Sequence, residues 1–448
     1  MIIFFYNVVM DTIAAISTPD GRGGIGIVRI SGDEAIEVAS RVFSASVELK
    51  DVESRKMILG TVNLNNANDK ALCVVFRAPN SYTGEDVVEL HCHGGISLIN
   101  AVLKAVLSAG ARLATAGEFT KRAFLNGKLK LADAEGIIDI INAQSVSAVN
   151  AAYRLMSGKL SADTGVIQNK LLDLIAYLEA VMDYPEELED EGIPDGKRIT
   201  GELFDELKKL YDTKDVGRMI KNGVAVAIIG LPNAGKSSLL NCLLKSDRAI
   251  VTDIEGTTRD VVEDTLVYNG EMIRLLDTAG IRDTDNSVEK IGIDRSKEAV
   301  KGADVVVVVL DGAGEDSREK SLFELVKNKP YIVCVNKSDL GITRRVNEDY
   351  VVISAKTGEG TDELLKRLIN MTVKIDGDGE VITNERHAQA VKRAKDALER
   401  ALKNYDDFYI DCIVNDLKEA YDALGEITGN TVNEDVIEAI FNKFCVGK

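Results

Sequence analysis

The segment Gly230–Ser237, with the sequence GLPNAGKS, constrains the fold of this chain more than any other stretch. It follows the apolar run Val224–Ile229 and precedes a helix-compatible run, Ser238–Lys245. This order of strand, glycine loop and helix is typical of a phosphate-binding loop. The glycines let backbone N–H groups turn toward a phosphate, and the helix N-terminus adds positive potential. We therefore predict an α/β nucleotide-binding domain here.

Two side chains of this loop carry chemistry. Lys236 can reach the outer phosphates of a nucleotide, and the Ser237 hydroxyl can bind Mg²⁺. The alternative, a chance glycine turn, is disfavoured by the strand-to-helix context and by three motifs further along the chain. The nucleotide contacts that we predict in the loop are Asn233, Ala234, Gly235, Lys236, Ser237 and Ser238.

Three short motifs follow at the spacing of a Ras-like GTPase, each after an apolar run: Asp277-Thr278-Ala279-Gly280, Asn336-Lys337-Ser338-Asp339 and Ser354-Ala355-Lys356. Asp277 can support the Mg²⁺ shell, and the Gly280 N–H can contact the terminal phosphate. The Asp339 carboxylate can accept hydrogen bonds from the ring N–H and 2-amino group of guanine, a donor pair that adenine lacks. The backbone of residues 354–356 can meet the guanine carbonyl. These motifs predict GTP bound at the carboxyl ends of a mostly parallel sheet.

The polar segment Thr252–Asp260 is predicted to sense the γ-phosphate, with Thr258 as a further Mg²⁺ ligand. Its oxygen-rich residues and Asn233 can together surround a monovalent cation, which would offset phosphate charge where other GTPases use an arginine. We assign to the site the switch residues Thr252, Asp253, Ile254, Glu255, Gly256, Thr257 and Thr258.

The residue after the Asp277–Gly280 motif departs from the Ras-like pattern. Ras-like proteins have a glutamine there that orients the attacking water, but this chain has Ile281. Another residue must therefore position the water. Glu289 follows the polar segment Arg282–Ser287 and can reach the water. The alternative is that Glu289 only starts a helix, where the helix dipole favours an acidic residue.

The rest of the chain predicts a multidomain protein of α/β and all-α parts. Residues 11–127 have the pattern of a small α/β domain, with strands at Thr12–Ala15, Gly26–Ile30, Leu72–Phe76 and Val87–His91 and helices at Asp33–Phe43 and Ser97–Ser108. Helical periodicity then runs through Leu131–Val149, Ser161–Val181, Thr200–Leu210, Ala388–Leu402, Val414–Leu424 and Glu434–Phe444, the last with Asn433 as N-cap. Because helices on both sides of the nucleotide-binding region each need an apolar partner, we predict that this region is inserted into one helical domain.

Composition limits the setting of the chain. Its net charge of −18 disfavours nonspecific binding to polyanions over the whole surface, but local basic patches remain, such as Lys121, Arg122, Lys128 and Lys130. Six dispersed cysteines and the lack of a long apolar run favour a reducing cytoplasm and no membrane span. The apolar segment Met1–Met10 is either an amino-terminal extension before an initiator at Met10 or an edge strand.

The whole span from Asp11 to Lys448 resembles the MnmE (TrmE) family of tRNA-modification GTPases. The resemblance is carried by the nucleotide motifs and by five flanking stretches: Gly21–Gly32, Ser81–Asp86, His93–Gly95, Gly117–Phe124 and Cys445–Lys448. It implies a folate-binding-like α/β domain at 11–127, a helical domain at 128–219 and 376–448, and a GTPase domain at 220–375. It also implies a homodimer joined through the amino-terminal domains, an FAD-containing partner, MnmG, and a tRNA substrate. The product is a carboxymethylaminomethyl or related aminomethyl group on carbon 5 of the wobble uridine.

The same resemblance implies residue roles. A tetrahydrofolate one-carbon derivative would contact Arg29, Glu89, Lys128 and Lys448, and K⁺ would lie among Asn233, Thr252, Thr257 and the Ile254 carbonyl. Glu289 would position the water, and Cys445 would act in the modification chemistry. Lys130 departs from the family pattern, which has an acidic residue at that position.

Without the resemblance, these residues have simpler explanations. Arg29 and Glu89 are compatible with solvent-facing strand positions, Cys445 with an inert thiol, and His91 and His93 lack the further ligands of a metal site. Two other functions compete with tRNA modification: a ribosome-assembly GTPase of the Era or Der type and a folate-binding module with a vestigial GTPase. The acidic balance and the cysteine-containing tail argue against the first, and the intact nucleotide motifs argue against the second.

Overall fold

The chain forms two compact units, which are described separately. The first comprises residues within 1–138, 156–162 and 425–448, and the second comprises residues within 139–155 and 163–424. The computed structural model describes residues 11–19, 21–65, 67–184, 193–245, 250–251, 264–276, 297–314, 316–344, 349–372, 380–407 and 409–448.

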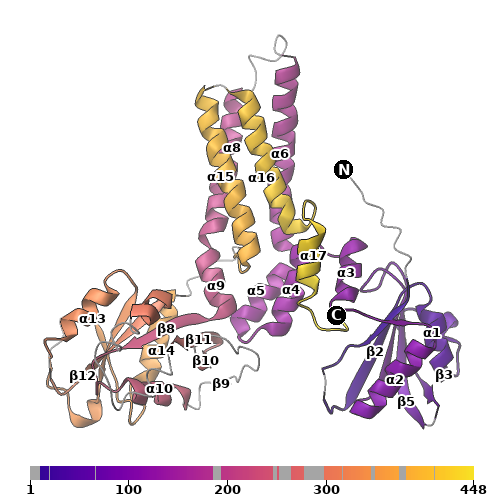
Figure 1. Ribbon diagram of the computed structural model, residues 1–448, viewed down its shortest axis with the longest axis horizontal. Coiled ribbons are helices and arrows are strands. Elements are labelled where there is room, and N and C mark those ends of the chain that lie inside the picture. The colour runs from indigo at the N-terminus through magenta and orange to yellow at the C-terminus, as the bar shows by residue number, and fades with distance from the viewer. Residues whose placement is uncertain are drawn as a thin grey trace. The chain divides into compact units, whose positions relative to one another are not determined.

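The first unit is built on a sheet with the strand order β3-β4-β5-β6-β2-β1-β7, which is antiparallel except for the β1–β7 pair. The strands are β1 Ile13–Ile16, β2 Ile25–Ser31, β3 Phe43–Ala45, β4 Met57–Leu64, β5 Ala67–Phe76, β6 Val87–His93 and β7 Arg112–Leu113. Helices α1 (Ala35–Val42) and α2 (Ile96–Ser108) lie side by side against it (Figure 1). Their apolar residues form one core with those of the central strands.

The predicted α/β pattern of this unit is confirmed, although the strands β3, β4 and β7 were not predicted. Each predicted strand and helix is present with bounds shifted by a few residues, apart from β5, which begins five residues earlier than its prediction. The longest of the unpredicted strands, β4, pairs with β5 in an antiparallel register from Met57↔Val74 to Leu64↔Ala67. Its apolar residues do not alternate with polar ones, because they stand on both faces of the strand: Leu59 is 65% exposed, whereas Val62 is fully buried.

The carboxyl-terminal residues belong to this first unit. Helix α17 (Glu434–Phe441) packs on α3 (Glu118–Leu125), where the rings of Phe124 and Phe441 lie 6.0 Å apart. The Asn433 side chain accepts a hydrogen bond from the Val436 N–H, which confirms the predicted N-cap. The helix ends at Phe441, three residues before the predicted end.

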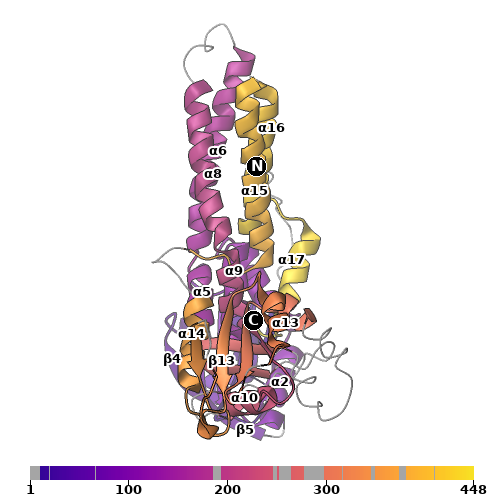
Figure 2. The same ribbon diagram turned by 90° about the vertical axis from the view of Figure 1, so that its left-hand side faces the viewer.

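Long helices form the bundle of the second unit. Helices α6, α8, α15 and α16 lie side by side in both views (Figures 1 and 2). Buried residues from both halves of the sequence line them, among them Leu171, Leu178, Leu203, Leu398 and Leu417. The helices flanking the nucleotide-binding region therefore pack together, as predicted. Their bounds are α6 Lys159–Asp183, α8 Ile193–Asp212, α15 Glu385–Asp407 and α16 Ile410–Thr428.

The single helix predicted over Leu131–Val149 is wrong. The structure has two helices, α4 (Leu131–Asn142) and α5 (Val146–Met156). The Ser145 hydroxyl accepts a hydrogen bond from the Ala148 N–H, so it starts α5 as an N-cap residue. Apolar spacing continued across this break, and periodicity alone did not reveal the cap.

The nucleotide-binding region of the second unit is a sheet with the order β14-β13-β12-β8-β11-β10-β9. Strands β14 to β11 are mutually parallel, and β10 and β9 are antiparallel additions. Strand β12 is buried from Val305 to Leu310, as expected for a strand covered on both faces. The bounds are β8 Val224–Ile229, β9 Ile250–Val251, β10 Asp264–Tyr268, β11 Glu271–Leu276, β12 Val305–Asp311, β13 Tyr331–Asn336 and β14 Tyr350–Val352, with helices α9 Lys214–Asn222, α10 Lys236–Leu244, α13 Glu319–Val326 and α14 Thr361–Thr372.

Candidate functional site

The glycine loop joins the fully buried strand β8 to helix α10, as predicted. A turn closes it, with the Ala234 N–H donating to the Leu231 carbonyl at 3.2 Å. Gly235 has φ of 95°, and a Cβ there would lie 2.1 Å from the amide nitrogen of Asn336. Only glycine fits this position. The first N–H groups of α10 have no acceptor within a helix and can therefore bind an anion.

Lys236 lies over this loop. Its Nζ donates to the carbonyl oxygens of Gly230 at 2.9 Å and Leu231 at 3.0 Å. Burial lowers the pKa of this ammonium below its ordinary value, because the charged form has lost water. A polyphosphate beside the loop would restore the missing stabilisation, so the position suits the predicted contact with the outer phosphates.

Asn336 links two of the predicted loops. Its Nδ2 donates to the Ala234 carbonyl at 2.9 Å, and its Oδ1 accepts from the Ala355 N–H at 2.9 Å. The residue is only 2% exposed, so both bonds lie in a dry environment where an unpaired polar group costs most. Asn336 therefore fixes the phosphate loop relative to the loop at residues 354–356. Its sequence motif indicated nucleotide binding but did not reveal this structural link.

The Asp339 carboxylate is held in place by residues of the neighbouring loop. Its Oδ1 accepts from the hydroxyl of the buried Ser354 at 2.8 Å, and Lys356 Nζ lies 3.9 Å from Oδ2. The Ser338 N–H donates to the Ile353 carbonyl and so joins the two loops. A carboxylate accepts several hydrogen bonds, so Asp339 keeps capacity for two donors on one edge of a base.

Lys337 takes the left-handed backbone conformation with φ of 71° and extends to strand β12. Its Nζ lies 2.7 Å from Asp311 Oδ2 at the end of that strand. Burial alone would raise the pKa of Asp311, but the Lys337 ammonium outweighs it, and the pKa lies below its ordinary value. This ion pair was not foreseen from the sequence, because Asp311 belongs to none of the motifs.

Several predicted site residues lie outside the described part of the chain, so nothing is said of their placement. They are Thr252, Asp253, Ile254, Glu255, Gly256, Thr257, Thr258, Asp277, Thr278, Ala279, Gly280 and Glu289. The strand β11, which precedes Asp277, is present as predicted and pairs with β8 in parallel.

In the first unit, the structure brings Arg29 and Glu89 together. They are direct partners in the β2–β6 register, and Arg29 Nε donates to Glu89 Oε1 at 2.9 Å. Their side chains are only 17% and 15% exposed, which rules out the simple solvent-facing interpretation. The Arg29 guanidinium also lies 5.5 Å from the ring of Tyr82 and 5.7 Å from that of Phe119. Both aromatic residues lie in stretches that carry the family resemblance, Ser81–Asp86 and Gly117–Phe124, but their contact with Arg29 was not predicted.

The carboxyl-terminal tail lies against the same strands. Gly447 O accepts from the Ser17 hydroxyl at 3.1 Å and from Arg29 at 3.4 Å, and Val446 forms a bridge with Ala116. Burial, followed by the nearby Arg29, lowers the pKa of Lys448, against an opposing effect of Glu89. Lys448 is therefore grouped with Arg29 and Glu89, as the resemblance implied.

Other candidate residues of this unit are placed differently. Lys128 donates to the Pro79 carbonyl at 2.9 Å, and in the part of the chain that the structure describes no hydrogen bond or ion pair joins it to Arg29 or Lys448. Cys445 is exposed, whereas burial raises the pKa of Cys92 to about 12. Arg122 does not contribute to a basic patch, because it is 8% exposed and pairs with Glu85, Asp11 and Glu118.

Comparison with known proteins agrees with this geometry. A family profile described as the MnmE helical domain matches residues 131–445, and one described as the GTP-binding protein TrmE N-terminus matches residues 12–128. The chain is 43% identical over 455 residues to the tRNA modification GTPase MnmE of Clostridioides difficile (strain 630), covering 98% of this chain and 99% of that one. The chain belongs to the MnmE family. A second member, from Thermoanaerobacter pseudethanolicus, is 42% identical over 461 residues. The aligned region covers 98% of this chain and 100% of that one.

Membership of the MnmE family confirms the predicted architecture and makes the chain a GTPase. The residues that would act in the two sites are proposals, since the comparisons identify the family and not individual roles. Among the described helices, no segment is both long and apolar enough for a membrane span.

Proposed function

We propose that this chain hydrolyses GTP to drive modification of tRNA, in which a carboxymethylaminomethyl or related aminomethyl group is added to carbon 5 of the wobble uridine. One observation carries the proposal: a single MnmE-family chain contains both a loop suited to guanine recognition, in one unit, and a polar cluster, in the other. Asp339 held by Ser354 supports the first part. Arg29, Glu89 and the tail residue Gly447 support the second.

The residues at the phosphate loop fit GTP. The loop turns around Gly235, Lys236 is placed over it, and the Asp339 carboxylate has capacity for the donor pair of guanine. Ser237, Thr258 and Asp277 would hold Mg²⁺, and Asn233 with Thr252, Ile254 and Thr257 would hold K⁺. These ions, when bound, supply positive charge against the phosphates. In place of the usual glutamine, Glu289 would orient the attacking water.

The polar cluster of the first unit fits a folate one-carbon carrier. A half-buried carboxylate such as Glu89 accepts hydrogen bonds from the amino and ring N–H groups of a pterin, and Arg29 and Lys448 attract the carboxylates of its tail. The partly exposed Tyr82 ring beside Arg29 offers an apolar surface for a flat heterocycle, and the buried Phe119 ring supports Arg29 from the core. Lys128 would act from the neighbouring loop, and the exposed Cys445 thiol would meet the one-carbon unit or the uridine.

A homodimer joined through this unit is also proposed. Leu59 and Leu72 are directly paired on β4 and β5 and are 65% and 38% exposed, and Met57 on the same face of β4 is 48% exposed. An exposed apolar strand face favours association with a second copy. The further partners would be tRNA and the FAD-containing MnmG protein, all in the cytoplasm.

The proposed function is tested in cells that lack this protein. Mass spectrometry of their tRNA is expected to show wobble uridine without the aminomethyl-type group. Wild-type complementation should restore it, whereas Cys445→Ser should restore GTP turnover alone. Persistence of the group in the deletion cells would contradict the proposal. GTP turnover in KCl against NaCl tests the potassium site separately, since equal rates would exclude it.

A further inference from the structure

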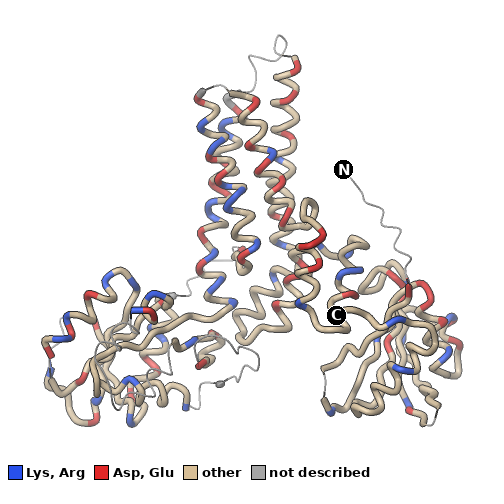
Figure 3. The backbone as a smooth tube through the Cα atoms, in the orientation of Figure 1, with Lys and Arg blue, Asp and Glu red and all other residues tan. Residues whose placement is uncertain are grey.

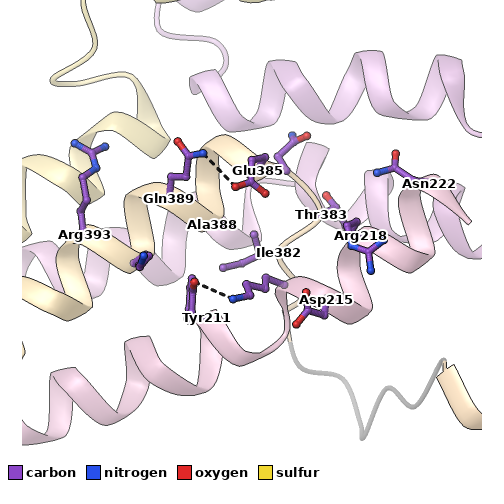
Figure 4. A pocket seen from close by; sticks show the side chains of 13 residues that line it. Tyr211, Asp215, Arg218, Asn222, Ile382, Thr383, Glu385, Ala388, Gln389 and Arg393 are labelled. Carbon is purple, nitrogen blue, oxygen red and sulfur yellow. Dashed lines mark hydrogen bonds between the residues drawn. The ribbon is translucent and has the colours of Figure 1, made fainter. Parts of the chain in front are cut away.

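A cavity of about 560 Å³ opens beside α9, the helix that leads directly into the phosphate-loop strand (Figure 4). Its walls come from α9, from the end of α8, and from the segment 382–384 with the start of α15. Ile382 closes one side, where a Cβ at Gly217 would lie 2.0 Å from the Ile382 carbonyl oxygen. The cavity therefore lies where the chain enters and leaves the nucleotide-binding region.

The lining of this cavity is predominantly basic. It carries four cationic side chains, Lys214, Arg218, Lys392 and Arg393, against two carboxylates, Asp215 and Glu385. In Figure 3 the lower part of α15 and the adjoining α9 show several basic positions. This local excess contrasts with the net charge of −18 over the chain. Most of the acidic surface of this chain repels a polyanion. A cavity with a local excess of positive charge is therefore the place where a polyanion would bind.

Neighbouring groups leave part of this positive charge available. Arg218 pairs with Asp304. Lys392 is exposed and makes no ion pair with any residue that the structure describes. Lys214 donates to the Tyr211 hydroxyl at 2.8 Å, a neutral partner that positions the ammonium without cancelling its charge.

Polar uncharged groups complete the lining. Asn222, Thr383 and Gln389 add hydrogen-bond donors around the cations. Gln389 also donates to Glu385 at 3.1 Å, which occupies part of one of the two carboxylates (Figure 4). The Tyr211 ring already has two ammonium groups near it, Lys214 at 4.0 Å and Lys395 at 5.4 Å from the ring centre, and these would compete with a stacked base. The chemistry therefore suits phosphate groups and not nucleobases.

A second cavity in the same unit provides a contrast. It measures about 480 Å³, and its lining has Lys170 and Arg198 against Asp173, Asp195 and Glu202. Its net charge is negative, and both cations are already paired, Lys170 with Glu206 at 3.2 Å and Arg198 with Glu202 at 2.6 Å. Lys170 and Arg198 are therefore matched controls, two cations that line a cavity without a surplus of positive charge.

We propose that the cavity between α9 and α15 binds phosphate groups of the tRNA backbone. The inference rests on the proposed function, since it assigns to that substrate a contact on this chain. The contact would lie next to the strand that leads into the phosphate loop, so tRNA would hold the segments through which the nucleotide-binding region joins the helical bundle.

The test measures binding of unmodified tRNA to the full-length chain over a series of KCl concentrations. Lys214→Ala/Lys392→Ala is expected to weaken binding about 10-fold at low salt and to reduce the slope of log K against log salt by about 1–2, since each lost phosphate contact removes roughly one unit. Lys170→Ala/Arg198→Ala removes the same charge and should change the affinity less than about 2-fold. Lys392→Arg should keep wild-type affinity, and all variants should keep wild-type GTP turnover.

Equal losses in the two double variants, or no loss in the first, would overturn the inference. The inference would also be overturned if Lys214→Ala/Lys392→Ala lost binding of inorganic phosphate but bound tRNA as the wild type does, because the cavity would then bind a small anion. These outcomes leave the proposed function intact, which is decided by wobble uridine in the deletion cells.

Discussion

The side-chain amide of Asn336 donates a hydrogen bond to the main-chain carbonyl of Ala234 at 2.9 Å, across 102 positions of sequence. The same side chain accepts a hydrogen bond from Ala355. One buried residue therefore joins the glycine loop, which is predicted to bind phosphate, to the loop at residues 354–356, which is predicted to meet guanine. Because the two loops lie at the ends of strands β8 and β14, which are not neighbours in the sheet, this contact sets the distance between them.

Replacement of Asn336 by alanine should weaken GTP binding by about 10–100-fold and lower the free energy of unfolding by about 2 kcal/mol, since two buried backbone groups lose their partner. Titration with a fluorescent guanine nucleotide measures the first effect. Asn336→Asp keeps the acceptor toward Ala355 but loses the donor toward Ala234. Its affinity should still fall, and wild-type affinity in either variant would contradict the structural role.

Asp339→Asn should convert the base preference from guanine to xanthine. The amide that replaces the carboxylate presents one acceptor and one donor, which matches the 2-oxo group of xanthine and leaves a clash of donors with guanine. We expect GTP affinity to fall by about 100-fold or more and XTP to be hydrolysed. Competition binding with both nucleotides checks this.

The matched control is Lys356→Ala, since its Nζ lies 3.9 Å from the carboxylate at an exposed position. A surface ion pair of this kind contributes little, so GTP should remain the preferred nucleotide. Unchanged base preference in Asp339→Asn would show that another group recognises guanine.

The nucleotide site was the most predictable part of the molecule, because its signals are local in sequence. Strand β12 is a run of apolar residues since both its faces are covered, and the glycine loop follows a strand of the same kind. Each predicted motif that the structure describes lies at the end of its strand. What the sequence could not indicate is how the loops contact one another, as Asn336 and Asp311 illustrate.

Where prediction failed, the deciding contacts are distant in sequence. Arg122 was taken as part of a basic patch, but the carboxylates that bury it come from Asp11, Glu85 and Glu118. Leu59 was not predicted as a strand residue. It is an apolar residue on the exposed face of the sheet, so it breaks the alternation of apolar and polar residues that would indicate a strand. The break between α4 and α5 depends on one serine cap within an apolar pattern that runs on unchanged.

Gly447 should be irreplaceable for docking of the tail. Its φ is 101°, and a Cβ there would lie 2.1 Å from the Ile16 carbonyl oxygen. Gly447→Ala is therefore expected to release residues 445–448, which are held by the bridge between Val446 and Ala116, and to speed their hydrogen exchange about 10-fold, with GTP turnover unchanged. Mass spectrometry of the carboxyl-terminal peptide measures this exchange.

Gly127→Ala is the matched control for the tail. Gly127 also has a positive φ, 69°, but a Cβ there would meet no atom within 4 Å. This variant carries the backbone strain without the close contact, so hydrogen exchange of residues 445–448 should stay at the wild-type rate. Equal rates in the two alanine variants would contradict the proposed clash with Ile16.

Glu118 should give the first unit part of its stability at neutral pH. Burial would raise the pKa of this carboxyl, but hydrogen bonds from Arg112, Thr115 and Arg122 outweigh burial and lower the pKa from 4.5 to about 2. A lowered folded-state pKa means that the stabilisation is complete above about pH 4.5 and is lost as the pH falls toward 2.

Glu118→Gln should therefore reduce the local unfolding free energy of α3 by about 1–2 kcal/mol at pH 7, a value discounted for solvent because Arg112 is 44% exposed. Hydrogen exchange of peptides covering Glu118–Leu125 measures it. The difference from wild type should shrink between pH 5 and pH 3, because the carboxyl of the unfolded state becomes protonated near pH 4.5 while that of the folded state is still ionised. Glu48→Gln, which changes a fully exposed carboxyl, should show no difference at either pH. A gap for Glu118→Gln that stays constant over this range would mean that the residue stabilises α3 by packing and not by charge.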